Sequence, residues 1–241
     1  MIRREVLIVL LLGTATDNSS VSPQVPPMNL TARPREVGSS SLRPGTSTVS
    51  LSNGRSGLLR VPDGAISGLV VALHGAGGQA AAAVRLFDQV ADELGLVLLA
   101  PASAGRTWAM LLRGPDHDTP ALDSALGDLF AAHPFDPARV AVAGFSDGAS
   151  YALSLGLANG HLFPNVVAFS PGFEAADRYQ GRPAFFITHG TGDEVLPISR
   201  TSRRVVPALR HNGYEVRYQE FAGGHVIPPE LAVAAARWVL R

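Results

Sequence analysis

The sequence predicts a protein of the α/β class, with a mostly parallel central sheet and helices on both of its faces. Short runs of almost continuously apolar residues alternate along the chain with longer stretches in which apolar residues recur at helical spacing. This alternation is typical of repeated strand–helix units, and strands covered by helices on both faces are apolar throughout. Hydrophobic residues make up 46% of the chain and charged residues 17%, which indicates a well-packed globular core.

The apolar runs and the stretches between them give the expected strands and helices. Central strands are expected at residues 69–73, 96–100, 140–143, 166–169 and 184–188, and flanking strands at residues 58–61 and 215–221. Helices are expected at residues 79–94, 122–132, 148–157, 199–211 and 229–240. Open sheets of this kind bind ligands beyond the carboxyl ends of their strands, so the residues that follow the strands are the candidates for function.

The first 56 residues are expected to lie outside this domain, which is placed at residues 57–241. Ser, Thr, Pro, Gly and Asn dominate residues 13–56, and no apolar periodicity persists there. The segment is therefore interpreted as a flexible tail or linker. A chain of 241 residues is long enough for one α/β domain, and one domain is expected.

Residues 1–15 have the order of a secretory signal. Arg3 and Arg4 precede the apolar run 6–12, and Gly13-Thr14-Ala15 supplies small residues for cleavage. The run is far shorter than the roughly 20 residues that a membrane-spanning helix needs, so no stable membrane insertion is expected. Translation that begins at Met28 is the alternative. The first interpretation implies an exported protein and the second a cytoplasmic one.

The charge balance and the absence of cysteine exclude several classes of function. Twenty Lys and Arg residues balance twenty Asp and Glu residues, so no net field attracts nucleic acid or an anionic membrane. A neutral or small organic ligand is expected instead. With no cysteine in the chain, disulfides, thiolate nucleophiles and Cys-ligated zinc are excluded. The oligomeric state is left open.

The strongest motif is Gly144-Phe145-Ser146-Asp147-Gly148, which follows the apolar run 140–143 and precedes a helical stretch of small residues. G-x-S-x-G between a strand and a helix is typical of a nucleophile elbow, in which a sharp turn exposes the serine hydroxyl. Glycine is needed on both sides because the tight turn presses these positions against neighbouring backbone. Ser146 is therefore the candidate nucleophile.

A serine hydroxyl needs an imidazole to take its proton and a carboxylate to orient that imidazole, and in this fold they follow in the order Ser, acid, His. Asp193 follows the strand expected at 184–188, and His225 follows the strand expected at 215–221, so both are expected at the edge that carries Ser146. Glu194 is the alternative acid. His189 is expected to bond loop backbone rather than to act in catalysis.

The loop His74-Gly75-Ala76-Gly77-Gly78 follows the strand expected at 69–73 and is the candidate oxyanion hole. Its donors are expected to be the backbone N–H groups of Ala76 and of Asp147. A phosphate-binding loop is the alternative, but Ala80 stands where G-x-G-x-x-G requires its last glycine. His74 is expected to pack against the loop and bond it.

Two aromatic residues near the expected strand ends are candidates for the substrate pocket. Trp108 lies in the segment that follows the strand at 96–100, and Phe173 in the segment that follows the strand at 166–169. The alternative for Trp108 is that it anchors its loop to the core, because aromatic side chains do both. No H-E-x-x-H motif or close His/Asp cluster occurs, so no metal site is expected.

Taken together, these motifs resemble the phospholipase/carboxylesterase branch of the α/β-hydrolases, and they are similar to polyhydroxybutyrate-depolymerase-like and feruloyl-esterase-like enzymes. The resemblance covers about residues 57–241. It implies hydrolysis of carboxylic esters or thioesters without metal or cofactor, and it supports Ala76 as an oxyanion donor. Many members of this branch carry glutamine after the nucleophile, whereas this chain has Asp147. A carboxylate that faced the site would oppose a developing oxyanion.

Three functions remain open from the sequence. The first is an esterase that acts on a small-molecule or polymer-end ester, because no long insertion predicts a lid. The second is a thioesterase or acyltransferase with the same three residues. The third is a binding protein that keeps the scaffold without catalysis, since a fold alone does not determine function.

Overall fold

The computed structural model describes residues 28–112 and 115–241. The expected signal-like segment at residues 1–15 lies outside the described residues. No helix in the described part of the chain is long and apolar enough to cross a membrane.

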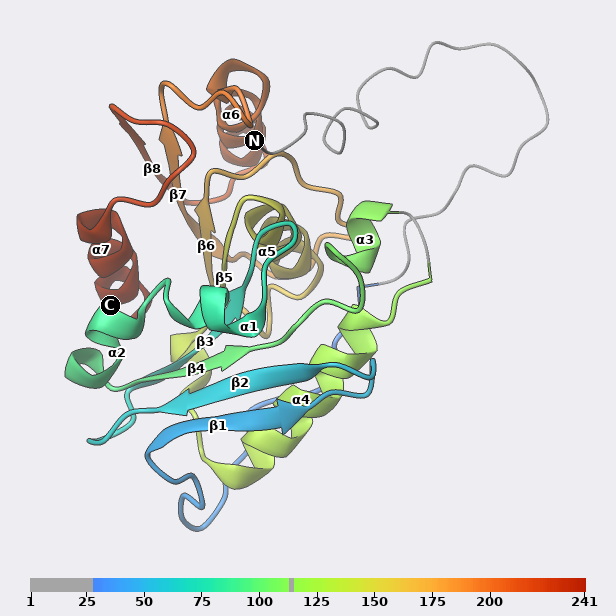
Figure 1. Ribbon diagram of the computed structural model, residues 1–241, viewed down its shortest axis with the longest axis vertical. Helices are drawn as coiled ribbons and strands as arrows, with labels where there is room; N and C mark the ends of the chain where they lie inside the picture. The colour runs from blue at the N-terminus through green and yellow to red at the C-terminus, as the bar shows by residue number, and fades with distance from the viewer. Residues whose placement is uncertain (1–27, 113–114) are drawn as a thin grey trace.

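One eight-stranded sheet runs through the molecule, with the strand order β1-β2-β4-β3-β5-β6-β7-β8 (Figure 1). The antiparallel strand β2 lies between β1 and β4, and the neighbouring pairs from β4 to β8 are all parallel. The carboxyl ends of the parallel strands therefore lie at the same edge. The strands are β1 (Gly45–Ser50), β2 (Ser56–Val61), β3 (Gly68–Leu73), β4 (Leu96–Ala100), β5 (Val140–Phe145), β6 (Asn165–Phe169), β7 (Ala184–Gly190) and β8 (Val216–Phe221).

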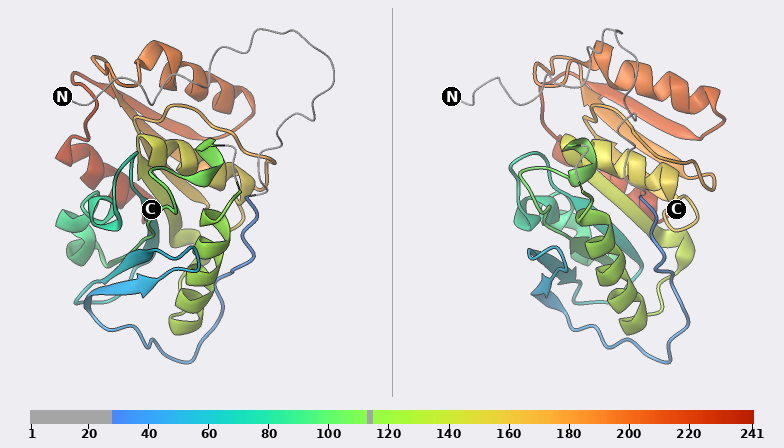
Figure 2. Two further views of the ribbon diagram at one scale, coloured as in Figure 1. Left: turned by 45° about the vertical axis from the view of Figure 1, so that its right-hand side comes forward. Right: turned by 90° about the vertical axis from the view of Figure 1, so that its right-hand side faces the viewer.

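Helices cover both faces of the sheet (Figure 2). The main helices are α1 (Ala80–Val84), α2 (Asp88–Leu94), α4 (Asp118–Ala132), α5 (Asp147–Ala158), α6 (Ser202–His211) and α7 (Pro229–Val239), and α3 (Ala109–Leu112) is a single turn. One core cluster holds α4, α5 and α6 against the sheet, and the other holds α1, α2 and α7. Strand β3 supplies residues to both clusters, because its successive side chains point to opposite faces.

All seven expected strands are present, with ends within two residues of the expected ones. The helix expected over residues 79–94 is instead two helices, α1 and α2. The helix is interrupted at Phe87, whose φ of −132° is not helical. The Phe87 ring packs against the Phe169 ring, with 6.0 Å between the ring centroids. Burial of this ring against β6 therefore accompanies the interruption of the helix.

The interpretation of residues 28–56 as flexible linker is wrong. Strand β1 lies inside this range and pairs along its whole length with β2. Met28 and Leu30 have no exposed surface, and the side-chain amide of Asn159 binds the backbone of both. Most side chains of β1 are exposed and polar, so the strand lacks the apolar pattern that identified the others.

The buried N-terminal segment is expected to stabilise the domain. Leu30→Ala removes a fully buried side chain and should lower the free energy of unfolding by about 3 kcal/mol, as measured by urea denaturation. Ser47→Ala, at an exposed position of β1, is the control and should change it by less than about 0.5 kcal/mol. Equal, small effects of the two substitutions would show that the segment does not contribute to the core.

Candidate active site

Ser146 lies at the turn between β5 and α5 in a backbone conformation that few residues other than glycine adopt. Its φ is 58° and its ψ is −119°. A Cβ on Gly144 would collide with the backbone of Gly148, and a Cβ on Gly148 would collide with the backbone of Leu73, so both positions require glycine. The Ser146 N–H donates to the Phe169 carbonyl oxygen at 2.9 Å, which ties the turn to β6. The turn thus presents the hydroxyl at the carboxyl edge of the sheet.

The structure brings the side chains of Ser146, His225 and Asp193 together. His225 lies between β8 and α7, and its Nε2 is 2.9 Å from the Ser146 Oγ. Its Nδ1 is 2.6 Å from the Oδ2 of Asp193, which follows β7. A carboxylate oxygen only accepts, so Nδ1 carries the proton in the neutral ring and Nε2 is left to accept from the hydroxyl. The three groups form one hydrogen-bonded chain.

Asp193 is held on both of its carboxylate oxygens, whereas Glu194 is exposed. The Oδ1 of Asp193 accepts from the backbone N–H groups of Val195 at 2.9 Å and Leu196 at 2.8 Å. The Asp193 residue is buried, with 5% of its surface exposed. Of the two acids that the sequence offered, Asp193 is the one that contacts the imidazole of His225.

The glycine-rich loop after β3 lies beside Ser146. A Cβ on Gly75 would be 3.4 Å from the Cβ of Ser146, so this loop passes close to the hydroxyl. The Gly77 N–H donates to the Arg106 carbonyl oxygen at 2.6 Å, which fixes the loop against the segment after β4. In the part of the chain that the structure describes, neither the N–H of Ala76 nor that of Asp147 has an acceptor.

The side chain of Asp147 is paired with a hydroxyl that the sequence analysis did not identify. Its Oδ2 accepts from the Thr107 Oγ at 2.7 Å. The segment after β4 therefore holds this carboxylate beside the site. No sequence signal joins the two residues, because Thr107 lies 40 positions earlier in the chain.

Trp108 has the anchoring role rather than a place on the site surface. Only 1% of its surface is exposed, and its ring stacks on Tyr151 at 4.9 Å between centroids. Its indole N–H donates to the His74 carbonyl oxygen at 2.9 Å, so it ties the loop after β4 to the loop after β3. The expectation that Trp108 lines a pocket is wrong because the ring is enclosed by the core. Phe173 is half-buried against the same core cluster.

His74 bonds the loops around it, as expected. Its Nδ1 lies 2.8 Å from the Gly75 carbonyl oxygen, and its Nε2 accepts from the Ser103 N–H at 3.1 Å. Burial lowers the pKa of His74, so the ring is neutral at neutral pH. His189 bonds backbone as well: its Nε2 is 2.8 Å from the Leu196 carbonyl oxygen.

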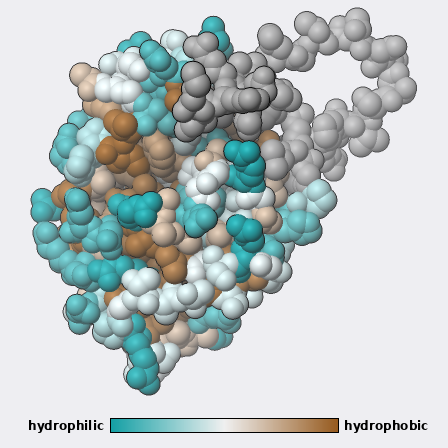
Figure 3. All heavy atoms as spheres, viewed as in Figure 1, coloured by the Kyte–Doolittle hydropathy of each residue, from teal (hydrophilic) through white to brown (hydrophobic). Residues whose placement is uncertain are grey.

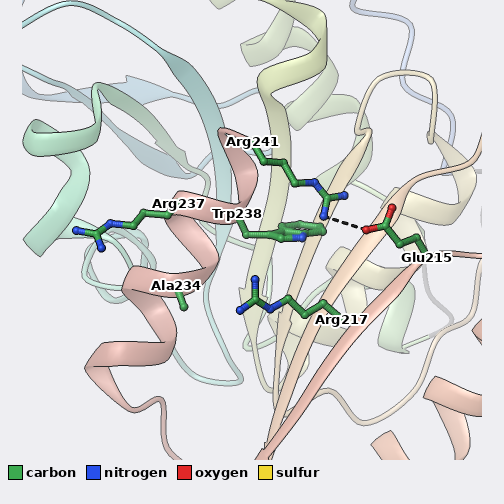
Figure 4. A pocket seen from close by; sticks show the side chains of 6 residues that line it. All are labelled: Glu215, Arg217, Ala234, Arg237, Trp238 and Arg241. Atoms are coloured by element: carbon green, nitrogen blue, oxygen red, sulfur yellow. Dashed lines mark hydrogen bonds and ion pairs between the residues drawn. The ribbon is translucent and has the colours of Figure 1, made fainter.

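A hollow of about 530 Å³ lies away from this site, at the end of the sheet where β8 begins (Figure 4). Arg241 stacks over the Trp238 ring there, 4.2 Å from its centroid, and pairs with Glu215 at 3.0 Å. None of the candidate site residues lines this hollow. Among the described residues, no group of three or more His, Asp or Glu side chains is arranged to hold a metal ion.

No family model matches the sequence, and no curated protein sequence matches it either. Solved structures do match. An esterase, PE8, is 23% identical with a TM-score of 0.60, and the match covers 82% of this chain and 98% of that one. An S-formylglutathione hydrolase from Staphylococcus aureus is 14% identical with a TM-score of 0.63, covering 81% and 98%. A phospholipase/carboxylesterase from Dyadobacter fermentans is 23% identical with a TM-score of 0.59, covering 83% and 97%.

These likenesses cover most of this chain and nearly all of each matched chain, at low sequence identity. Together with the mostly parallel sheet and the helices on both of its faces, they identify the fold. The chain therefore has the α/β-hydrolase fold.

Proposed function

We propose that the protein is a serine hydrolase that cleaves carboxylic esters through an acyl-serine intermediate. The observation that carries this proposal is the hydrogen-bonded chain from the Ser146 hydroxyl through His225 to Asp193, with links of 2.9 and 2.6 Å. Such a chain makes a serine hydroxyl nucleophilic at neutral pH. The solved structures that the chain resembles, which are described as an esterase, a hydrolase and a phospholipase/carboxylesterase, support the same reaction class.

The proposed reaction has two halves. The Ser146 oxygen bonds to the ester carbonyl carbon while its proton passes to the Nε2 of His225, and the Asp193 carboxylate stabilises the resulting imidazolium. The carbonyl oxygen becomes an oxyanion, which the N–H groups of Ala76 and Asp147 stabilise. The carbon–oxygen bond to the alcohol then breaks, and the alcohol leaves with the proton from His225. Water repeats the sequence on the acyl-serine and releases the acid.

Exposed apolar side chains flank the proposed site and favour a substrate with an apolar part. Val195 and Val226 stand next to the loop positions of Asp193 and His225, and they are 50% and 53% exposed. The surface on this side of the molecule mixes hydrophobic and hydrophilic residues, and hydrophobic surface lies near the connection between β8 and α7 (Figure 3). We therefore assign small-molecule or polymer-end esters as the substrate class.

Replacement of the nucleophile is the first test of the proposal. Ser146→Ala should abolish the hydrolysis of short p-nitrophenyl esters and the labelling of the protein by a fluorophosphonate probe. Ser199→Ala, at an exposed serine, is the control and should keep both. A folded Ser146→Ala variant that still hydrolyses the ester or still takes the label would refute the proposal.

The choice of acid is tested by a matched pair of substitutions. Asp193→Asn should lower kcat by about 10⁴-fold, because an amide nitrogen opposite Nδ1 favours the wrong tautomer of His225. Glu194→Gln should change kcat by less than about twofold, since that side chain is exposed. A larger loss from Glu194→Gln than from Asp193→Asn would reverse the assignment of the acid.

The pairing of Asp147 is expected to protect the oxyanion hole. Thr107→Val removes the hydroxyl that binds the carboxylate and should lower kcat/KM by about tenfold, the scale of a hydrogen bond to a charged group. Asp147→Asn in the same chain removes the charge and should recover most of that loss. If the double variant is no better than Thr107→Val alone, the charge of Asp147 is not what Thr107 controls.

A further inference from the structure

We propose that His189 is a positioning residue that holds Asp193 in place for His225, and that Ser202 sets the tautomer of His189. The inference rests on the proposed function, because it assigns a role within the same proton-transfer chain. His189 is the penultimate residue of β7, and Ser202 is the first residue of α6. Neither residue has exposed surface.

The neighbours of the His189 ring allow only one arrangement of its proton. The Nε2 lies 2.8 Å from the Leu196 carbonyl oxygen and 3.2 Å from the Oδ2 of Asp193. Both of these atoms are acceptors, so Nε2 carries the proton. The Nδ1 lies 2.7 Å from the Ser202 Oγ and therefore accepts from that hydroxyl. The Nε2–H therefore donates to the Leu196 carbonyl oxygen, and the same edge of the ring faces the Oδ2 of Asp193.

The Oδ2 of Asp193 thus lies between two imidazoles: it accepts from the Nδ1 of His225 at 2.6 Å, and the Nε2 of His189 lies 3.2 Å away. The Oδ1 accepts the backbone N–H groups of Val195 and Leu196. Three donors bind the carboxylate, and His189 packs against Oδ2 and holds the carbonyl of Leu196, whose N–H is one of those donors. This leaves the carboxylate plane little freedom to rotate. Since that plane directs Oδ2 toward His225, His189 controls the orientation of the base without touching substrate.

The charge of this arrangement suits a base that becomes positive during the reaction. Burial lowers the pKa of His189, with opposing contributions from Leu196 and Asp193, so the ring adds no second positive charge beside His225. The other ionisable groups near the ring are Glu220, its register partner on β8, and Arg203, which pairs with Glu220 at 2.7 Å. Arg203 and Glu220 neutralise each other, so the pair places no net charge beside the His189 ring.

The test compares two replacements of His189. His189→Phe keeps a ring but has no donor, whereas the amide nitrogen of His189→Gln reaches about as far as Nε2 and keeps one. His189→Phe should lower kcat by about 10- to 100-fold with KM within about threefold, and His189→Gln should recover most of the loss. His211→Gln, at an exposed histidine of α6, is the control and should match the unaltered protein.

The pH profile separates positioning from simple packing. Loss of the polar N–H edge beside Oδ2 leaves more negative charge on the Asp193 carboxylate, so it stabilises the His225 imidazolium more strongly. The acidic limb of kcat/KM reports the base of the free enzyme, so in His189→Phe it should move to higher pH. The proton on the His225 Nδ1, which the short 2.6 Å bond to Asp193 should deshield strongly, should shift in the NMR spectrum of His189→Phe and return in His189→Gln.

Ser202→Ala provides a second variant in case His189→Phe does not fold. It should change kcat and the deshielded proton in the same direction as His189→Phe, by a smaller amount. A folded His189→Phe, or a Ser202→Ala variant, with an unchanged acidic limb and an unmoved N–H resonance would overturn the inference. The NMR result does not need turnover, so it tests the inference even if ester hydrolysis by the unaltered protein is absent and the proposed function fails.

Discussion

The anchoring of Asp193 is the interaction on which the geometry of the site depends. Its Oδ1 is fixed by two backbone N–H groups of its own loop, and this leaves Oδ2 directed at the Nδ1 of His225. With that proton held on Nδ1, Nε2 has only its acceptor role toward Ser146. If Asp193 rotated, the imidazole would lose its fixed tautomer, and the hydroxyl would lose its acceptor.

The parallel sheet brings Ser146, Asp193 and His225 together although they are far apart in the sequence. Strands β5, β7 and β8 are parallel members of one sheet, so the loops that follow them emerge at the same edge (Figure 1). The turn at Ser146 carries a local cost, since a non-glycine residue at a φ of 58° is strained by about 1–3 kcal/mol. The fully buried residues of β5 and α5 on either side hold the turn in this conformation.

Local patterns predicted the parts of the molecule that depend on local chemistry. The apolar runs correctly predicted strands β2 to β8, and the G-x-S-x-G motif correctly predicted the turn at Ser146. The pattern failed at β1, because its exposed polar residues do not alternate with apolar ones. The sequence also did not predict the burial of Trp108, because that burial depends on tertiary contacts with His74 and Tyr151. The sequence likewise cannot predict that Thr107 binds Asp147 or that His189 contacts Asp193, because these contacts depend on how the loops fold in three dimensions.

In the proposed reaction Ser146 becomes covalently acylated while esters are hydrolysed, and this intermediate can be trapped. The protein would be mixed with a p-nitrophenyl ester and quenched in acid within the first turnovers, and its peptides would be mapped by mass spectrometry. The acyl mass should appear on Ser146 and disappear as the substrate is exhausted. Ester hydrolysis without an acyl adduct under conditions of burst release, or an adduct on a different residue, would contradict the proposed reaction.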